Sequence, residues 1–323
     1  MKRFERSKQA MAFNSSRLPD SWCSFLGIFN ASENTSVYYR VTLTTCIISS
    51  LLAPMIVVAN AFILAAIWKN PSLRTPSYVL LAGLAFTDFC TGLLTQPFFA
   101  VYQWADLTGN VKMFCIAGVI LQFVGYCFSS LTVIVITIMA VERWLHMSRR
   151  SLLTVRRVVI VYIMSAVLVI VLNACHMYNW YYTNEYFSTF IVVFFLGAAL
   201  CFFITGFSYF KVFRIIRHHQ SQIQTSRNAI NIDKYKKSVF TIFYILAILL
   251  LSYVPYVCNL AVINIMGYLS TKLARVSMNS CTVIVFSSSL ANPLLYYWRI
   301  EELRDKIRGI VRNFCCEATE EGS

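Results

Sequence analysis

The segment VTLTTCIISSLLAPMIVVANAFILAAIW, residues 41–68, contains no charged side chain. A helix needs about 20 mostly apolar residues to cross the hydrocarbon core of a bilayer. The segment is longer than that, and its apolar residues do not alternate with polar ones as they would in a strand. We therefore predict a membrane-spanning helix, because backbone polar groups in lipid have to be hydrogen-bonded within the segment itself.

Six further segments have the same character, and only one of them carries a charged residue, Asp88. We predict a helix for each of them: 75–105, 113–141, 158–184, 186–210, 238–271 and 276–298. A basic, amphipathic stretch follows the last segment from residue 299 to 314. The predicted fold is an all-α membrane protein, a seven-transmembrane helix bundle with a short amphipathic helix after the seventh.

The composition agrees with a membrane protein. Of the 323 residues, 58% are apolar or aromatic and 13% are charged, about half of the ~25% that is usual in soluble domains. The mean hydropathy is +0.63. A soluble fold of this size would lack the polar residues to cover its exterior, and a disordered chain would be far less apolar. The net charge of +14 therefore bears on membrane sidedness, and we expect no nucleic-acid partner.

The basic residues are distributed unevenly among the predicted loops. The loops after helices one, three and five, with the C-terminal tail, hold 19 Lys and Arg, whereas the loops after helices two, four and six hold three. The positive-inside rule places the richer set in the cytoplasm. Residues 1–40 are then an extracellular tail, 41–298 the membrane domain, and 299–323 the amphipathic helix and cytoplasmic tail. We expect a multi-pass plasma-membrane protein whose first helix acts as an uncleaved signal anchor.

The predicted extracellular tail also carries three sequons for N-glycosylation. The acceptor residues are Asn14, Asn30 and Asn34.

Asp88 lies in the middle of an apolar helix, where an ionisable group costs about 3 kcal/mol on insertion scales and needs partners. The depth and order of the polar residues in the other helices indicate five partners. These are Asn60, Thr132, Ser288, Ser289 and Asn292. Such a cluster either holds a hydrated cation or forms a structural polar network around a protonated carboxyl group.

Short motifs recur in order, each on a different predicted helix. They are VAN at 58–60, LAFTD at 84–88, ERW at 142–144, SYVP at 252–255 and NPLLY at 292–296. Over residues 38–316 the chain resembles the rhodopsin-like, or class A, G-protein-coupled receptors. The resemblance implies an extracellular ligand, a heterotrimeric G protein as partner, and a sodium ion near Asp88 as the only bound cofactor.

The resemblance also assigns roles in activation. Arg143 would contact the G protein, with an ordinary snorkelling arginine as the alternative. The helix-six acid that pairs with this arginine in some members is replaced by Tyr235, although Asp233 lies nearby. The remaining activation residues are Glu142, Tyr209, Tyr253, Pro255, Asn292, Pro293 and Tyr296. Both prolines lack a backbone donor, so we expect a kink or hinge in helices six and seven.

The family's ligand pocket lies in the outer half of the bundle. Thirteen residues are expected near it: Gln96, Phe99, Gln122, Gly125, Tyr126, Ser129, Phe194, Gly197, Tyr253, Tyr256, Leu260, Thr282 and Phe286. Gly125 stands where aminergic receptors carry an acid, and Phe286 stands where opsins carry the retinal lysine. The pocket therefore favours a neutral or lipid-like molecule, or a peptide that contacts Glu185 or Asp106 at the rim.

The cysteines depart from the family pattern. Gly118 replaces the cysteine at the outer end of helix three, and Cys115 lies one turn further out. Cys23 and Cys175 are the alternatives for its partner. The missing bridge, the short loop after helix four and the absent helix-five proline resemble the melanocortin, cannabinoid and lysophospholipid receptor branch. Cys315 and Cys316, after a basic amphipathic segment, have the composition of a palmitoylation site, with free tail thiols as the alternative.

Two other classes of membrane protein fit less well. A transporter would show repeat symmetry with paired broken helices, which the sequence lacks. An enzyme would show catalytic motifs such as HExxH or GxSxG, and none occurs. We therefore expect a receptor with no enzymatic activity, whose partners are a ligand, a G protein and membrane lipid.

Overall fold

The structure is a computed structural model that describes residues 36–148, 153–183, 187–222 and 272–320. Between residues 223 and 271 it describes 240, 243–244, 247–248, 250–259 and 261–262. Side chains are not described at 180–183, 187–191, 218–222, 272 and 313–320. The sequons, Asp233, Tyr235, Glu185, Cys23 and Leu260 lie outside the described residues, as do the side chains of Cys315 and Cys316.

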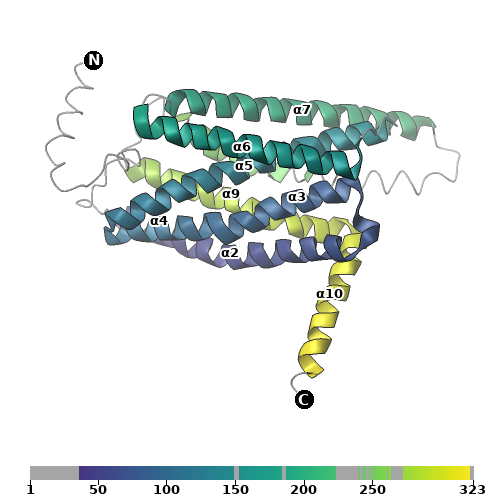
Figure 1. The fold of residues 1–323 in the computed structure, drawn as a ribbon, viewed down its shortest axis with the longest axis horizontal. Helices are drawn as coiled ribbons and strands as arrows, with labels where there is room; N and C mark the ends of the chain where they lie inside the picture. Colours follow the sequence, from purple (N-terminus) through teal and green to yellow (C-terminus); the bar gives the residue numbers. More distant parts are fainter. Residues whose placement is uncertain are drawn as a thin grey trace.

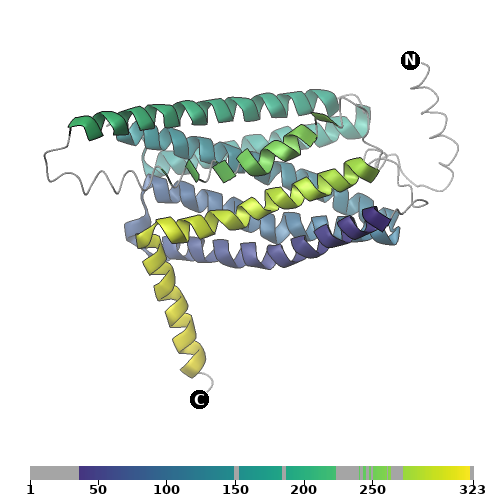
Figure 2. The ribbon, with the colours of Figure 1, turned by 180° about the vertical axis from the view of Figure 1, so that it is seen from behind.

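Helices form the whole of the described chain apart from short connections. In order they are α2 (Ser36–Lys69), η3 (Pro71–Leu73), α3 (Pro76–Cys90), η4 (Thr91–Thr95), α4 (Gln96–Thr108), α5 (Val111–Met147), α6 (Val155–Thr183), α7 (Phe187–Gln222), α9 (Lys272–Arg299) and α10 (Glu301–Glu320). Residues 250–259 are helical as well. The long helices lie side by side in one bundle, and α10 leaves it at a steep angle (Figures 1 and 2). The predicted all-α fold is confirmed.

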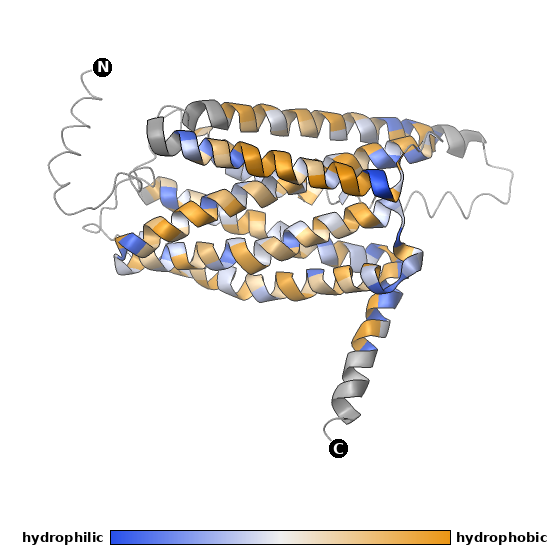
Figure 3. Cartoon of the chain, in the orientation of Figure 1, coloured by the Kyte–Doolittle hydropathy of each residue, from blue (hydrophilic) through white to orange (hydrophobic). Residues whose placement is uncertain are grey.

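The outer surface of the bundle is apolar. Five spans among the described residues are long and apolar enough to cross a membrane: Ser36–Lys69, Pro76–Thr108, Val111–Met147, Val155–Asn179 and Val192–Arg217. Apolar residues, drawn in orange, make up most of the length of these helices, and polar residues, drawn in blue, are most frequent near their ends (Figure 3). Large apolar side chains such as Leu168 and Phe203 are exposed, as expected where lipid is the solvent.

The second predicted helix contains a break that the sequence analysis did not anticipate. Its α-helical hydrogen bonding stops at Cys90, runs through the π-helical turn η4 and resumes in α4. Pro97 has no N–H to donate to the carbonyl of Leu93, which favours the looser turn. At Gly92 an added Cβ would lie 3.0 Å from the side chains of Ile56 and Val57, so any larger residue would push the turn and α2 slightly apart.

Three helix ends lie further along the chain than predicted, and one of them is that of α5, which continues to Met147 beyond the predicted end at residue 141. The second span extends to Thr108 and stops at Gly109, whose φ of 74° is left-handed, and the side chain of Asn110 then caps α5 by accepting from the Met113 N–H at 3.1 Å. Helix α7 continues to Gln222 beyond the predicted end at residue 210. No glycine or proline follows position 206 in α7, and its Lys and Arg residues are good helix formers.

The principal core packs the inner halves of the helices together with α10. Tyr296 and Leu303 are fully buried in it, one from α9 and one from α10. The Tyr78 hydroxyl donates to the Glu302 carboxylate at 3.0 Å, which ties α10 to α3. The amphipathic segment predicted over 299–314 is thus a helix docked against the end of the bundle.

Candidate functional site: a polar core within the helix bundle

The carboxylate of Asp88 lies at the centre of the predicted polar cluster. The Asn292 side chain donates from Nδ2 to Asp88 Oδ2 at 2.8 Å, and Ser289 is a second hydrogen-bond partner. Asp88 and Asn292 are 2% and 3% exposed. These contacts join α3 to α9 across 204 positions of sequence.

Asn60 completes the cluster from α2. Its Nδ2 donates to the Ser289 carbonyl at 3.2 Å and to the Ile56 carbonyl at 3.0 Å. Ser289 lies four residues before Pro293, so its carbonyl is the one that loses a helical donor to the missing proline N–H. Asn60 therefore replaces a backbone hydrogen bond in α9, which runs through Pro293 as one helix.

Thr132 and Ser288 lie close by. Thr132 Oγ1 donates to Thr87 Oγ1 at 3.4 Å, and the Ser288 hydroxyl donates to the Val285 carbonyl at 2.6 Å. The structure therefore gathers all the predicted partners of Asp88 into one buried region between α2, α3, α5 and α9.

A small cavity adjoins this cluster on the outer side. Seven of the ten residues that line it carry a hydroxyl group, and none carries a charge. The lining comprises Thr91, Thr95, Gly125, Ser129, Thr132, Tyr253, Val285, Phe286, Ser288 and Ser289. Four predicted ligand-pocket residues thus share a cavity with three predicted partners of Asp88.

Other predicted ligand residues contact one another through their aromatic rings. Phe99 and Phe286 meet edge to face with ring centroids 5.4 Å apart, and Tyr126 and Phe194 do so at 5.7 Å. Tyr126 is also hydrogen-bonded to Tyr256 and Gln122. These side chains come from five different parts of the chain, as a shared pocket requires.

Three of the expected ligand residues have other surroundings. Gly197 is exposed on α7, with no atom within 4 Å of where a Cβ would stand, so its expected place in the pocket is not supported. Gln96 is fully buried without a side-chain partner in the described chain, and it is not among the residues that line the cavity. Thr282 donates to the Met278 carbonyl at 2.8 Å within its own helix.

A second polar cluster surrounds Arg143 near the C-terminal end of α5. Arg143 Nε lies 3.6 Å from Glu142 Oε2, and the Ser77 hydroxyl donates to Glu142 Oε1 at 2.9 Å. The Glu142 side chain is 5% exposed and the Arg143 side chain 21%. Glu142 is therefore held by α3 while its arginine stays accessible.

Two of the predicted activation residues, Tyr209 and Tyr296, lie in the core near this end. Tyr209 is 9% exposed and Tyr296 fully buried, and neither hydroxyl has a hydrogen-bond partner within the described residues. A buried hydroxyl without a partner costs about 1–3 kcal/mol. Both groups are thus available for a new bond when helices move, or for a bound water.

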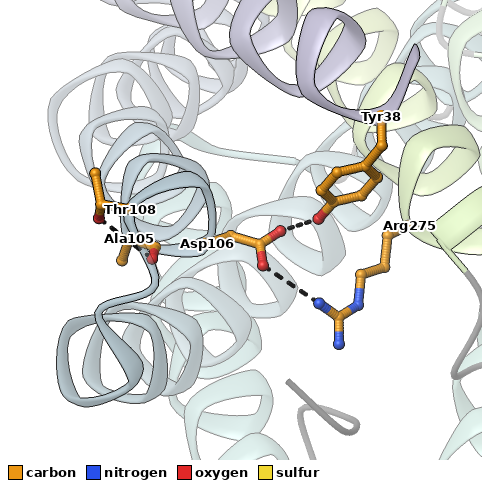
Figure 4. A network of polar contacts seen from close by, with 5 residues as sticks. All are labelled: Tyr38, Ala105, Asp106, Thr108 and Arg275. Atoms are coloured by element: carbon orange, nitrogen blue, oxygen red, sulfur yellow. Dashed lines mark hydrogen bonds and ion pairs between the residues drawn. The ribbon is translucent and has the colours of Figure 1, made fainter. Parts of the chain in front are cut away.

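A further polar network, at the outer end of the bundle, was missed from sequence. The Tyr38 hydroxyl donates to Asp106 Oδ2, and Arg275 Nη1 lies 3.3 Å from Asp106 Oδ1 (Figure 4). The network joins α2, α4 and α9. Asp106 and Arg275 fall in predicted loops, and Tyr38 precedes the first predicted helix. The sequence signal for Tyr38 is its place one turn before the buried polar residues Thr42, Thr45 and Ser49 of α2.

The cysteine near this network is oxidised. Cys115 is disulfide-bonded, whereas Cys175 and the other described cysteines outside that bond carry free thiols. Of the two partners considered from sequence, Cys175 is therefore excluded.

Comparison with known proteins agrees with these features. The family model described as seven-transmembrane receptor, rhodopsin family, matches residues 59–296. The chain belongs to the rhodopsin family of seven-transmembrane receptors. It is a multi-pass membrane protein and a G-protein-coupled receptor, which confirms the resemblance drawn from the motifs.

Several relatives of the receptor match over most of their length. Lysophosphatidic acid receptor 1 of Bos taurus is 23% identical over 90% of this chain and 79% of the relative. Melanocortin receptor 5 of Rattus norvegicus is 21% identical over 89% and 87%, and adenosine receptor A3 of Canis lupus familiaris is 20% identical over 82% and 90%. The crystal structure of squid rhodopsin shares the fold, with a TM-score of 0.70 at 16% identity over 94% of this chain and 93% of that one.

Proposed function

We propose that the receptor binds a neutral, amphiphilic small molecule in the outer half of the bundle and signals through Arg143 to a heterotrimeric G protein. The observation that carries this proposal is the hydroxyl-lined cavity, which joins the ligand-pocket residues to the Asp88 cluster. A ligand group that fills this cavity would contact both sets at once. Binding would thereby favour one arrangement of α5 and α9 over another.

Charge around the cavity argues for a neutral ligand. Its described lining contains no charged side chain that would offset the desolvation of an ammonium or phosphate group. A peptide would have to use the rim, where Asp106 already pairs with Arg275 and Tyr38. Among the relatives, one is named for lysophosphatidic acid and one for adenosine, which supports a small molecule, although here the binding group would be uncharged.

A sodium ion is the second part of the proposal. Asp88 supplies a buried carboxylate, Ser288, Ser289 and Thr132 supply hydroxyl oxygens, and Asn60 Oδ1 is buried without a hydrogen-bond partner in the described chain. These hard oxygen donors fit a monovalent cation. No group of three acidic, histidine or cysteine side chains occurs among the described residues, which disfavours a divalent ion. The ion would supply positive charge that holds the Asp88 carboxylate ionised between α3 and α9.

The membrane orientation follows from the basic residues. We place the N-terminus outside and the C-terminus in the cytoplasm, with glycans on Asn14, Asn30 and Asn34 and acyl chains on Cys315 and Cys316. The direction of α10 supports the last assignment, because it leaves the bundle at a steep angle, as a helix lying on the membrane surface would (Figure 1).

The ligand proposal is tested by filling the cavity. A library of neutral amphiphiles is screened with cells that express the receptor and a promiscuous G protein, and hits are repeated with Gly125→Leu. An added Cβ at Gly125 faces Thr95 at 3.6 Å inside the cavity, so leucine should abolish the response. Gly197→Leu, on the exposed side of α7, is the matched control and should respond as wild type. A full response from Gly125→Leu would contradict the proposed site.

A further inference from the structure

The inner end of α7 carries three basic side chains stacked on aromatic rings. Lys211 Nζ lies 5.2 Å from the ring centroid of Phe207, Arg214 Cζ lies 5.9 Å from that of Phe210, and Arg217 Cζ lies 4.7 Å from that of Phe213. Each pair is separated by four residues, so each cation lies one turn beyond its ring. We call these six residues the basic-aromatic face.

This face points away from the core. The rings of Phe207, Phe210 and Phe213 are 44%, 57% and 47% exposed, whereas Val212 and Ile216 on the opposite side of the helix are buried in the principal core. Phe207 borders the Arg143 cluster, because its ring meets that of Trp144 edge to face with centroids 5.7 Å apart, whereas the rings of Phe210 and Phe213 lie outside it.

The same side of α7 continues toward the outer end as an apolar ridge. Leu196, Leu200 and Phe203 occupy it at helical spacing and are 65%, 59% and 73% exposed. A surface this apolar contacts acyl chains in a membrane protein. The basic-aromatic face is thus the place where a lipid-covered ridge reaches the headgroup level, and Arg217 is the last residue of the apolar span.

No acidic side chain in the described part of the chain compensates the positive charge on this face. Helix α7 contains no Asp or Glu, and no carboxylate among the described residues pairs with Lys211, Arg214 or Arg217. The three charges span the seven residues from Lys211 to Arg217, about 9 Å along the helix axis. A headgroup with a single negative charge would balance only one of them.

We propose that the basic-aromatic face binds one multiply phosphorylated inositol phospholipid of the cytoplasmic leaflet. The acyl chains would lie along the Leu196–Phe203 ridge, and the phosphates would contact Lys211, Arg214 and Arg217. The rings hold the basic groups in place by cation–π contact. The Lys and Arg side chains therefore lose less rotamer freedom when the lipid binds, which favours binding. The proposal is independent of ligand identity and of the coupling role of Arg143.

The experiment uses the purified full-length receptor in detergent. Native mass spectrometry counts adducts of phosphatidylinositol bisphosphate over a concentration series, with phosphatidylserine as the singly charged comparison. Arg214→Gln with Arg217→Gln should weaken bisphosphate binding roughly twenty-five-fold, since each basic residue near a membrane surface contributes about fivefold. Arg156→Gln with Arg157→Gln removes two exposed arginines at the start of α6 and should leave binding as in wild type.

A second variant tests the rings separately from the charges. Phe210→Leu with Phe213→Leu keeps every charge and an apolar surface, and should weaken binding several-fold because the stacked geometry is lost. Unfolding temperatures without lipid should match wild type for all three variants, because the altered side chains lie outside the core.

Three results would overturn the proposal. First, binding could survive in the Arg214→Gln, Arg217→Gln variant, which would show that these arginines do not bind the lipid. Binding could instead fall equally in the α6 control, which would show only a general effect of positive charge. Free inositol trisphosphate could compete as well as the lipid, which would make the site one for soluble phosphates. Finally, unchanged binding by the Phe210→Leu, Phe213→Leu variant would show that the aromatic rings take no part in lipid binding.

Discussion

The side chain of Asn60 donates a hydrogen bond of 3.2 Å to the backbone carbonyl of Ser289, the carbonyl that Pro293 leaves without a helical donor. The contact joins α2 to α9 at the level of Asp88, where Asn292 binds the carboxylate. A proline in the middle of a membrane helix is thus accommodated by a side chain from a neighbouring helix. The bond also makes the shape of α9 depend on the position of α2.

This relationship predicts a specific energetic coupling. Asn60→Ala should lower the free energy of unfolding by about 1–2 kcal/mol, because a buried carbonyl loses its donor. In a Pro293→Ala background the helix supplies its own N–H, and the same change should cost less. The coupling, about 1 kcal/mol, is measured by unfolding the four variants of the cycle in mixed micelles. Strictly additive effects would show that Asn60 does not serve that carbonyl.

Sodium should stabilise the receptor through Asp88. A bound ion raises the unfolding temperature by mass action, so wild type should melt higher in sodium chloride than in choline chloride of equal ionic strength. Asp88→Asn keeps the shape and removes the charge, and the difference between the salts should vanish. Asp106→Asn, a change of the same kind outside the cluster, should keep the difference. If wild type melts equally in both salts, the Asp88 cluster is structural only.

Arg143 should be required for coupling but not for folding. It is 21% exposed beside Glu142, so Arg143→Ala should abolish nucleotide exchange on a purified G protein while surface expression stays near wild type. Glu142→Gln removes the only ion pair described for Arg143 and should raise ligand-independent exchange a few-fold, since a pair with one partly exposed member contributes on the order of 1 kcal/mol. Exchange by Arg143→Ala at the wild-type rate would contradict the assignment.

The same reasoning extends to helix six. Tyr235→Glu would offer Arg143 a new acidic partner and should lower basal exchange, whereas Asp233→Ala should raise it if Asp233 already serves as that partner. A wild-type receptor silent at high expression, with no effect of either change, would contradict both versions.

The bundle and its polar core followed from sequence because their causes are local. Long uncharged segments form helices in lipid because their backbone groups must be hydrogen-bonded within the segment. Asp88 in such a segment needs polar partners, and the structure supplies Asn292 and Ser289. The ligand pocket was less predictable. Gly197 was assigned by its position along α7, but the rotation of that helix depends on packing with α5, which no motif encodes.

Features that arise between helices were missed for the same reason. The π-helical turn at Thr91–Thr95 depends on Pro97 and on the close approach of α2 to Gly92 together. The outer network joins Tyr38, Asp106 and Arg275, which stand far apart in the chain and looked like separate loop or boundary residues. Only the packing of α2, α4 and α9 places them in contact.

Cys115 should be resistant to alkylation in the folded receptor until it is reduced, because it is disulfide-bonded. Cys175 carries a free thiol on the exposed surface of the apolar span of α6 and should be labelled without reduction by a membrane-permeant maleimide. Of the candidates from sequence, Cys23 remains as the partner. Non-reducing peptide mapping should therefore find a Cys23–Cys115 peptide, and Cys23→Ser should leave Cys115 open to labelling. A mapped bond between Cys115 and any other cysteine would contradict this assignment.

The network of Tyr38, Asp106 and Arg275 should hold the C-terminal end of α4 and the N-terminal end of α9 together. The side chains of Arg275 and Asp106 are 16% and 7% exposed, so their ion pair is shielded from water and salt. Breaking it leaves a shielded charge without its partner, which costs more than the loss of an exposed pair. The free energies of unfolding of Asp106→Asn, Arg275→Gln and the double variant should give a coupling energy of about 1–3 kcal/mol.

The Arg304–Asp305 pair in α10, at 4.0 Å with the Asp305 side chain 68% exposed, is the matched control and should have a coupling energy of less than about 0.5 kcal/mol. Equal coupling in the two pairs would show that the Asp106–Arg275 pair contributes no more to stability than an ordinary surface ion pair. The network would then have no part in positioning α9.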